Sequence, residues 1–599
     1  MSASIAHAES LRPLLSSYST VGTTGPEREL VQHNHTSHQN IGLGIAPGTG
    51  GTIALVGAAF VLAAALLVAA IPHGMGVTPD STQYLSVSSN LLAGDGLRVH
   101  WWNEGSEPLT HFPPGFPFVL AGLMRAALAP ETAAFIVNLF ALAVTTALAF
   151  ALTRRVAGGS MAAGIAAAFA VPLARDVLSV HAMIWSEAVF IALGLAALLA
   201  IIRSIETDAW PALIVAAVLA GLASTTRYVG LALIGACALS LLVIGVAPLG
   251  RRCLRAVAFL LIACLPIGLL LLRNVQAGTS ATNRDIAFHP PVPGQLRIGA
   301  RALYSWFIPV SGPDWLEALL VLAVAVTATV FILSIIRAPR QAASFEGRTR
   351  QARAVLLVYS AGYVVFLLLS ITFADAQTTP NSRLLSPILP VVLILLIGEL
   401  VTRMASVETR RPAVSTSLAL GVSAVVSQAV WITEARRDGL GYNSLAWQRS
   451  GLVAAVTSLP PSAIIYTNAP GAIAYRAGRE VLGIPRHANP NSMLPQSDFP
   501  ARMRTVCARA SSQTVVYAFF NEASDEWFLP SIAEVRRYWH SRPSLVFPEG
   551  VLDTVPQTCG VLADKPGTAD TLPPQGSSSP VSPAKHCPAQ MLSCREGHD

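Results

Sequence analysis

The stretch IALVGAAFVLAAALLVAAIP, residues 53–72, decides the fold class. It contains no charged side chain, and a helix of about 20 apolar residues is long enough to cross the hydrocarbon core of a bilayer. The rest of the chain has the same character: 53% of its 599 residues are hydrophobic, 12% are charged, and the mean hydropathy is +0.54. This composition is too apolar for a soluble globular protein and predicts an integral membrane protein.

Further apolar runs of similar length predict an α-helical polytopic membrane protein with about eleven transmembrane helices. The predicted spans cover residues 53–72, 131–153, 159–175, 185–202, 210–225, 229–247, 256–272, 315–336, 354–373, 384–402 and 413–432. Two of these runs are short and rich in alanine, so the count has a margin of one or two.

Arginine placement orients these spans, because loops that stay in the cytoplasm keep Lys and Arg close to the span ends. With eleven spans, the arginine-rich loops share one side and the N-terminus is cytoplasmic. These arginines are Arg154, Arg155, Arg251, Arg252, Arg255, Arg337, Arg340, Arg348, Arg350, Arg353, Arg403, Arg410 and Arg411. We expect a multi-pass plasma-membrane protein in contact with membrane lipids. Its net charge of +7 reflects this topology and not a nucleic-acid partner.

Composition divides the chain into four segments. They are a disordered cytoplasmic tail (1–50), a transmembrane module (51–433), a small extracytoplasmic α/β domain (434–561) and a disordered C-terminal tail (562–599). The α/β domain is predicted from two β-branched runs, AIIYTN at 463–468 and TVVYAFF at 514–520, which alternate with helical stretches. The tails are polar or rich in Pro, Ser and Gly, and such segments cannot bury enough apolar surface to fold.

Four of the seven cysteines fall in the region expected outside the cell. An even number in an oxidising compartment favours disulfides, and we expect a Cys507–Cys559 bridge with a looser Cys587–Cys594 pair. The other three cysteines lie in or beside predicted spans, where a thiol behaves as a small hydrophobic group.

Two long loops, 73–115 and 273–314, lie on the outer side in this topology, and both are longer than a connector needs to be. In the first loop the apolar residues from Tyr84 to Leu92 have helical spacing and predict a short helix along the membrane surface. This helix should end near Gly94 and Gly96. Two long loops on one face could close over a site.

Asp80 is the first candidate for a functional residue, because it follows the opening span by about eight residues and lies close to the apolar slab. A carboxylate in such a position is costly unless it has a partner or a function. The alternative is structural. Asp80 precedes STQYL and could cap the predicted helix by accepting hydrogen bonds from its first N–H groups.

The order of short motifs resembles the polytopic GT-C glycosyltransferases, and most closely the branch with the protein O-mannosyltransferases and the lipid A aminoarabinose transferase. The motifs are DSTQYL (80–85), PPGFPFVLAGL (113–123), SEAVF (186–190), ASTTRYVGLAL (223–233), LLRN (271–274) and RLLSPILP (383–390). The resemblance implies a GT-C fold, a polyprenyl-phosphate sugar donor, chemistry on the outer face and Asp80 as the catalytic carboxylate. Mannosyltransferases carry Asp-Glu at this place, whereas Ser81 follows Asp80 here, which leaves a protein acceptor open.

Three arginines are candidates for binding the donor phosphate, because Arg227, Arg273 and Arg383 each fall at the outer end of a predicted span. A guanidinium there can hold a phosphate with two hydrogen bonds, although simple exposure of the charge to the interface is the alternative. The candidate substrate-binding residues are Tyr84, Trp101, Trp102 and Glu187.

Each of these residues also has a structural alternative. Glu187 could instead orient an arginine or cap a helix, and the tryptophans could belong to the interfacial aromatic belt. Asp176 and His181 could join the site from the third outer loop. No His/Cys cluster has metal spacing and no cofactor is expected, although a divalent ion at Asp80 stays open.

The sequence therefore predicts a membrane glycosyltransferase that moves a sugar from a polyprenyl-phosphate donor to an envelope glycan, lipid or protein, with Asp80 as the general base. A transporter or lipid-carrier flippase is the main alternative. Charges are rare inside the predicted spans and no inverted repeat is visible, which disfavours that alternative. A membrane scaffold without catalytic activity is the third possibility.

Overall fold

The computed structural model describes residues 48–99, 107–277, 280–308, 345–490, 492–523 and 526–559, with a few single positions between 315 and 322. Several predicted features lie outside these residues. They are the C-terminal tail with the Cys587–Cys594 pair, nearly all of the N-terminal tail, nearly all of span 315–336, and both Trp101 and Trp102.

Within the described residues, six helices are long and apolar enough to cross a membrane. They are α1 (Thr49–Ala70), α4 (Pro130–Val156), α7 (Glu187–Thr207), α10 (Leu249–Gln276), α13 (Phe345–Phe373) and α16 (Val407–Asp438). Helices α5 (Met161–Leu173) and α6 (Arg175–His181) make a seventh if they are taken as one span with a 57° bend. The chain is a multi-pass membrane protein, but the predicted count of about eleven spans is not confirmed.

Three predicted spans are occupied by shorter helices. These are α8 (Trp210–Thr226, 17 residues), α9 (Gly230–Val243, 14 residues) and α15 (Leu389–Met404, 16 residues). At a rise of 1.5 Å per residue they are roughly 21 to 26 Å long, less than the thickness of a typical hydrocarbon core. The run 384–402 breaks because its first residues belong to a separate short helix, α14 (Ser382–Leu385), ahead of the N-terminal proline of α15.

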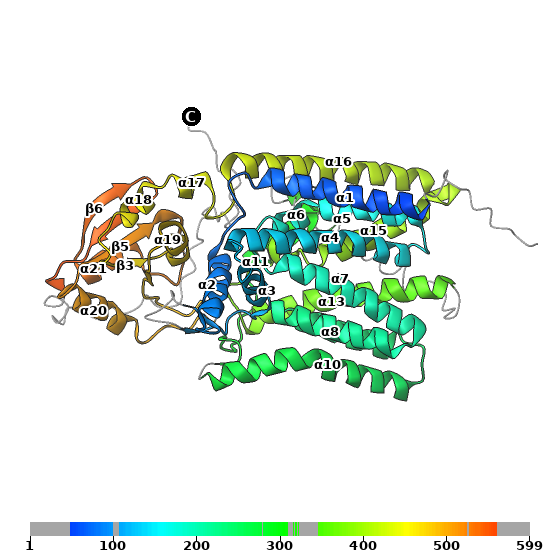
Figure 1. Cartoon of the computed structure of the whole chain (residues 1–599), viewed down its shortest axis with the longest axis horizontal. Helices are drawn as coiled ribbons and strands as arrows, with labels where there is room; N and C mark the ends of the chain where they lie inside the picture. The colour runs from blue at the N-terminus through cyan, green and yellow to red at the C-terminus, as the bar shows by residue number, and fades with distance from the viewer. Residues whose placement is uncertain are drawn as a thin grey trace, which may run out of the picture. The chain divides into compact units, whose positions relative to one another are not determined.

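Ion pairs join neighbouring helices at both ends of the helix bundle, whose helices lie side by side in Figure 1. At one end, Arg155 near the end of α4 pairs with Glu206 near the end of α7. Arg353 near the start of α13 donates to the carbonyl of Val156 and pairs with Glu399 at 2.9 Å. These arginines belong to the loops predicted to be cytoplasmic. The first residue of α7, Glu187, lies at the opposite end of that helix.

The segment after α1 forms a small cap of α2 (Pro79–Ala93), β1 (Arg98–Val99), β2 (Glu107–Pro108) and α3 (Gly115–Met124). Helix α2 confirms the predicted short helix, and it stops at Gly94, whose φ of 90° lies in the left-handed region that glycine tolerates best. The end of α10 and the chain after it contact this cap: the Arg273 guanidinium donates to the carbonyls of Leu97 and Leu109, and Arg284 donates to the carbonyl of His111. The two long loops therefore lie against each other, and the second continues into α11 (Pro293–Ser305).

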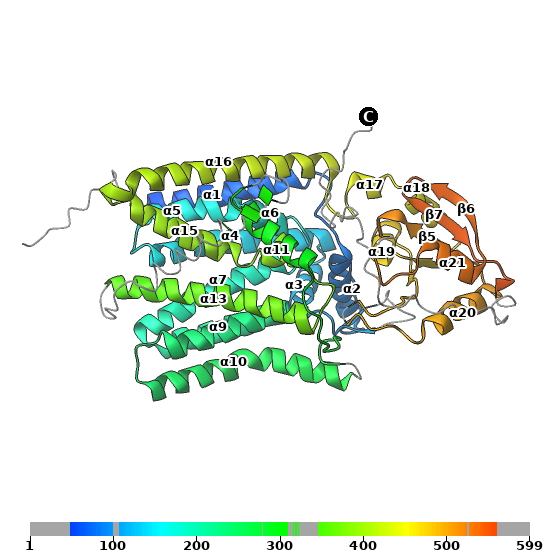
Figure 2. The same ribbon diagram turned by 180° about the vertical axis from the view of Figure 1, so that it is seen from behind.

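The C-terminal α/β region is present as predicted (Figure 2). Its five strands are β3 (Ile464–Thr467), β4 (Leu482–Gly483), β5 (Val515–Phe520), β6 (Arg542–Phe547) and β7 (Gly550–Thr554), in the order β4-β3-β5-β7-β6. Strand β3 is parallel to both β4 and β5, while β7 is antiparallel to β5 and β6. The helices are α17 (Leu445–Gln448), α18 (Gly451–Thr457), α19 (Pro470–Ala477), α20 (Phe499–Ala510) and α21 (Ile532–Trp539).

Strand β5 explains why this sheet has a core on both faces. All six of its residues are buried, and successive side chains of a strand point to opposite faces. Val515, Tyr517 and Phe519 pack with residues of α20 and α21 on one face. The alternate residues of β5 pack with α18 and α19 on the other face. A continuous apolar run therefore becomes the central strand of a three-layer region.

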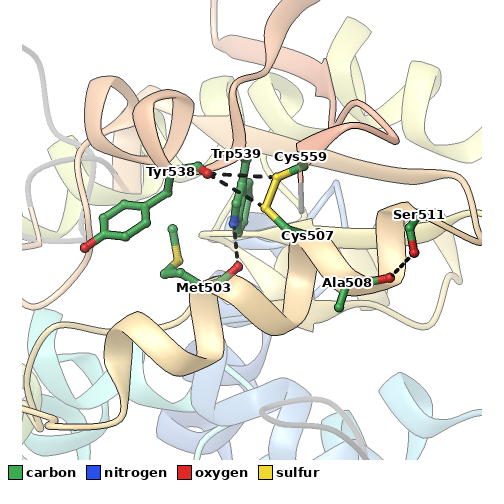
Figure 3. The surroundings of a disulfide bond; sticks show 7 residues. All are labelled: Met503, Cys507, Ala508, Ser511, Tyr538, Trp539 and Cys559. Carbon is green, nitrogen blue, oxygen red and sulfur yellow. Dashed lines mark hydrogen bonds between the residues drawn. A yellow bond between two sulfur atoms is a disulfide. The ribbon is translucent and has the colours of Figure 1, made fainter. Parts of the chain in front are cut away.

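Cys507 on α20 and Cys559 form a disulfide, which confirms the predicted pairing (Figure 3). Their Cα atoms are 5.1 Å apart, and the bridge lies beside Trp539, whose indole N–H donates to the carbonyl of Met503. The bond ties α20 to the residues after β7.

The segment that leads into α2 is held on two sides. Gly76 forms a parallel bridge with Met183, and Val77 forms one with Gly441, just after α16. Gly441 has a φ of 55°, and a Cβ atom there would collide with the Val77 carbonyl, so the close approach requires glycine. Residues from two distant parts of the chain thereby fix the start of α2.

Candidate functional site

The first turn of α2 presents Asp80. Thr78 is the N-cap residue and Pro79 occupies the first helical position. The Ser81 hydroxyl accepts a hydrogen bond from the Thr78 backbone N–H at 3.0 Å, and Ser81 is fully buried. Because Thr78 and Ser81 cap the helix, the structural alternative that Asp80 is the N-cap is wrong. The carboxylate of Asp80 is left available for other contacts.

Arg383 on α14 links two carboxylates. Its Nη1 lies 2.7 Å from Oδ2 of Asp80, and its Nε lies 2.5 Å from Oε1 of Glu187. Burial opposes the charge on Arg383, but the two carboxylates outweigh that effect and raise the pKa of the guanidinium well above its usual range. Arg383 therefore stays protonated, and it holds Asp80 as a carboxylate partner.

Glu187 accepts a second arginine. The same oxygen, Oε1, lies 2.5 Å from Nη1 of Arg227, and the Glu187 side chain has no exposed surface. Arg227 and Arg383 are 15% and 18% exposed. The four side chains form a continuous series, Asp80–Arg383–Glu187–Arg227, whose formal charges cancel. Such a balanced set satisfies the requirement that a buried charge has a partner.

The ring of Trp185 completes the support of Arg383. The guanidinium carbon lies 4.1 Å from the ring centroid, within the range of a cation–π contact. The indole N–H donates to the Thr78 hydroxyl at 2.8 Å, so the tryptophan also contacts the cap of α2. Trp185 was not a predicted site residue, although it directly precedes Ser186 and Glu187 in the sequence.

A cavity of about 1030 Å³ opens in front of Asp80. Asp80 lines it, whereas Arg227, Glu187 and Arg383 are not among its lining residues. The Asp80 side chain is 25% exposed. One wall of the cavity comes from the segments around α2, α6 and Trp185, and the other comes from the C-terminal α/β region. Asp80 is thus the member of the four-residue series that a ligand in the cavity can reach.

His111 also lines this cavity, from the loop before α3. Burial, together with the charges of Arg284 and Arg486, lowers the pKa of His111 to about 3. The imidazole is therefore neutral near pH 7 and in that state can accept or donate a single hydrogen bond at each nitrogen. Arg284 contacts the same loop, donating to the His111 carbonyl at 3.3 Å.

The other predicted residues are placed differently. Tyr84 is almost fully buried: its ring packs against Phe112 and Phe116, and its hydroxyl lies 3.3 Å from that of Ser186. Arg273 contacts loop carbonyls and neither carboxylate of the series. The roles proposed for these residues stay predictions, as do those of Trp101 and Trp102.

Of the two residues in the third predicted outer loop, Asp176 lines the cavity and accepts a hydrogen bond from the Trp306 indole at 3.1 Å. His181 is fully buried and is not a lining residue; one ring nitrogen lies 2.7 Å from the Val177 carbonyl. In the described part of the chain, no group of three or more His, Cys, Asp or Glu side chains could hold a metal ion.

Comparison with known proteins identifies the fold. No protein-family model matches the sequence, and no curated protein matches it. The structure is similar to that of ArnT from Cupriavidus metallidurans bound to undecaprenyl phosphate, with 15% identity and a TM-score of 0.50 over 86% of this chain and 99% of ArnT.

The chain has the GT-C fold. Two further solved structures are similar to it. The archaeal oligosaccharyltransferase AglB from Archaeoglobus fulgidus has 12% identity and a TM-score of 0.47, over 77% of this chain and 69% of AglB. The arabinofuranosyltransferase AftD from Mycobacteria has 14% identity and a TM-score of 0.47, over 86% of this chain and 40% of AftD. The GT-C assignment agrees with the resemblance seen in the sequence motifs.

Proposed function

We propose that this protein is a membrane glycosyltransferase that uses a polyprenyl-phosphate-linked sugar and modifies an envelope glycan, lipid or protein on the outer face of the plasma membrane. The observation that carries the proposal is the position of Asp80: a partly exposed carboxylate at the wall of a large cavity, paired through one oxygen with Arg383. The GT-C fold and the undecaprenyl phosphate bound to ArnT support the choice of donor.

The chemistry requires a base and a means of holding the departing phosphate. The acceptor hydroxyl oxygen attacks the anomeric carbon of the donor sugar, the bond from that carbon to the phosphate oxygen breaks, and polyprenyl phosphate leaves. In this proposal Asp80 takes the proton of the acceptor hydroxyl. The ion pair with Arg383 fixes the direction of the Asp80 carboxylate, as a general base requires.

Arg383 is the one of the three arginines that is paired with Asp80, and it would contact the departing phosphate by turning toward the cavity, which it does not line in this structure. Two of its nitrogens, Nε and Nη1, are engaged by carboxylates. Among the described residues no acceptor is paired with its Nη2, which leaves a donor for a phosphate oxygen. Arg227 would add charge from behind, and Arg273 would first have to exchange its carbonyl partners for phosphate oxygens.

The experiment compares Asp80→Asn with Asp95→Asn. Asp95 is an exposed carboxylate of the same cap and does not line the cavity, so it is a matched control. The purified chain is placed in lipid nanodiscs with a panel of radiolabelled polyprenyl-phosphate pentoses, hexoses and amino sugars, plus a membrane extract as the source of acceptor.

With the donor that wild type uses, Asp80→Asn should lower transfer by roughly 100- to 10,000-fold, whereas Asp95→Asn should match wild type. Both variants should fold, because the α2 cap uses neither carboxylate, but Asp80→Asn should lose some stability with the Arg383 ion pair. Transfer by folded Asp80→Asn at the wild-type rate, or no transfer by wild type from any donor in the panel, would refute the proposal.

A further inference from the structure

The C-terminal α/β region directs one particular edge toward the Asp80 cavity. The residues that line the cavity from this region include Thr467 at the end of β3, Asn468 directly after it, Arg486 after β4, and Glu522 after β5. Strands β3, β4 and β5 are mutually parallel, so all of these residues lie at carboxyl ends of parallel strands. The amino-terminal ends of β3 and β5 contribute no residue to the described lining, and both residues of the short strand β4 line it.

The connections of these strands make this edge unusual. From β3 the chain crosses through α19 to β4 on one side, and from β4 it crosses back through α20 to β5 on the other side. Helix α19 packs on one face of the sheet and α20 on the opposite face. Strand β3 is therefore the point where the winding of the sheet reverses. In open α/β sheets, ligands bind in the crevice outside the carboxyl ends of the strands at such a point.

Asn468 closes the base of this crevice. Its side-chain amide donates to the Phe520 carbonyl at 2.8 Å and accepts from the Phe520 N–H at 2.8 Å, which ties the end of β3 to the end of β5. Glu522 and Glu526 follow directly, with exposed side chains among the cavity-lining residues. The crevice thus has a rigid floor with carboxylates at its mouth.

The charges around the crevice are balanced, which indicates the class of ligand. Two positively charged residues, Arg486 and Arg502, line the cavity together with two negatively charged residues, Glu522 and Glu526. A carboxylate only accepts hydrogen bonds and a guanidinium only donates them. A hydroxyl group can satisfy both kinds of side chain, because it donates a hydrogen bond to a carboxylate and accepts one from a guanidinium. A strongly anionic ligand would instead favour a surplus of arginines.

Aromatic side chains supply apolar surface beside these charges. Phe528 lines the cavity, with the Arg486 guanidinium carbon 5.3 Å from its ring centroid, and Tyr442 and Trp447 line it as well. A pocket with apolar walls and a few directed polar groups suits a compact ligand with both apolar and hydroxyl faces. A sugar ring has C–H faces and a rim of hydroxyls.

We propose that the carboxyl ends of β3, β4 and β5 form a binding site for a hydroxyl-rich carbohydrate acceptor, which reaches Asp80 across the same cavity. The inference rests on the proposed glycosyltransferase function and names its acceptor class. At about 1030 Å³, the cavity lies at the upper limit of ordinary small-molecule pockets, so it has room for an acceptor sugar and a donor sugar together.

Binding is measured on the full chain carrying Asp80→Asn, so that turnover does not interfere. The protein is held in lipid nanodiscs, because glycoside detergents themselves present sugars. The probes are methyl glycosides of neutral pentose and hexose disaccharides, with dodecyl phosphate and a Ser/Thr-containing peptide as alternatives, and dissociation constants come from isothermal titration calorimetry.

At least one disaccharide should bind. The double variant Glu522→Gln/Glu526→Gln should weaken its binding by about tenfold, since each substitution removes a charged hydrogen-bond acceptor. The control variant is Glu480→Gln, because Glu480 is an exposed carboxylate of the same region that does not line the cavity. This substitution should not change the affinity. Thermal unfolding checks that all three variants are folded.

Failure of this inference is distinguishable from failure of the proposed function. If no disaccharide binds, if the Glu522→Gln/Glu526→Gln variant binds as tightly as the control, or if only dodecyl phosphate or the peptide binds, the carbohydrate site is refuted even when Asp80→Asn abolishes transfer. If disaccharides bind as expected but Asp80→Asn transfers sugar normally, the site stands as a binding site and the catalytic role of Asp80 fails.

Discussion

The Arg383 guanidinium lies 2.7 Å from the carboxylate of Asp80, although more than half of the chain separates the two residues. Asp80 comes from the first turn of α2, directly after the first membrane helix, and Arg383 comes from α14, between α13 and α15. Their contact joins the loop after the first membrane helix to one of the last helices of the bundle. It also makes the orientation of the Asp80 carboxylate dependent on the packing behind Arg383.

Glu187→Gln tests that packing. The substitution leaves two guanidinium groups to share Asp80 alone, and breaking a buried ion pair from one side should cost about 3 kcal/mol or more. We expect a lower thermal unfolding temperature and a lower kcat, because Arg383 would no longer be held against Asp80. Glu399→Gln is the matched control, since Glu399 also bridges two arginines, Arg353 and Arg403, at the other end of the bundle.

The control should lose stability but keep the kcat of the folded fraction. If Glu187→Gln were as stable as wild type and changed only KM, Glu187 would contact the substrate directly and would not act through the arginines.

Ser81→Ala separates capping from catalysis. Loss of the Ser81 hydroxyl removes the hydrogen bond to the Thr78 N–H, and loss of a cap contact typically costs about 1 kcal/mol. The unfolding temperature should fall while the rate per folded molecule stays close to that of wild type. Asp80→Asn should instead lower the rate per folded molecule. A Ser81→Ala variant that is stable but inactive would contradict this division.

His111 should make stability depend on pH. The unfolded chain binds a proton at the His side chain near pH 6.5, whereas burial and the nearby arginines lower the folded pKa to about 3. The unfolded state thus binds more protons below pH 6.5, so stability is lost as the pH falls, by up to about 2 kcal/mol at pH 5. His111→Gln should lack this loss.

The measurement is the difference in unfolding temperature between His111→Gln and wild type at pH 7.5 and at pH 5. The variant should gain on wild type at the lower pH. An identical difference at both values would show that His111 titrates normally in the folded protein.

The Cys507–Cys559 bridge should stabilise the C-terminal α/β region. A sequence separation of 52 residues corresponds to about 4 kcal/mol in the chain-entropy description of disulfides. The double substitution Cys507→Ala/Cys559→Ala should make this region more sensitive to protease, with little effect on the membrane helices. Mass spectrometry of a non-reduced digest should find the linked peptides in wild type, and two free thiols in freshly isolated membranes would disprove the bond.

The membrane orientation stays a prediction from arginine placement. Alkaline phosphatase fused directly after Asp438, at the end of α16, should be active, whereas green fluorescent protein at the same place should not fluoresce in a bacterial host. The opposite result would place the Asp80 cavity on the cytoplasmic side.

The sequence by itself determined the local features of this protein. Hydropathy marked the membrane helices, because a span depends on the composition of one continuous segment. Helical spacing and Gly94 located α2, and β-branched runs located β3 and β5, since these signals depend on neighbouring residues. The span count was less secure, because breaks such as the one before α15 depend on how the helices pack.

Only the tertiary structure decided the partners of the charges and the shape of the cavity. Asp80, Glu187, Arg227 and Arg383 were each visible as candidates, but nothing local in the sequence pairs residues from four different helices or loops. Strand β3 was predicted from the sequence. Its carboxyl end lines the same cavity as Asp80 because of the strand order in the sheet and because of two bridges, one between Val77 and Gly441 and one between Gly76 and Met183. The physical reason is that ion pairing and cavity formation depend on distances between remote segments, and those distances are fixed only when the buried surfaces pack together.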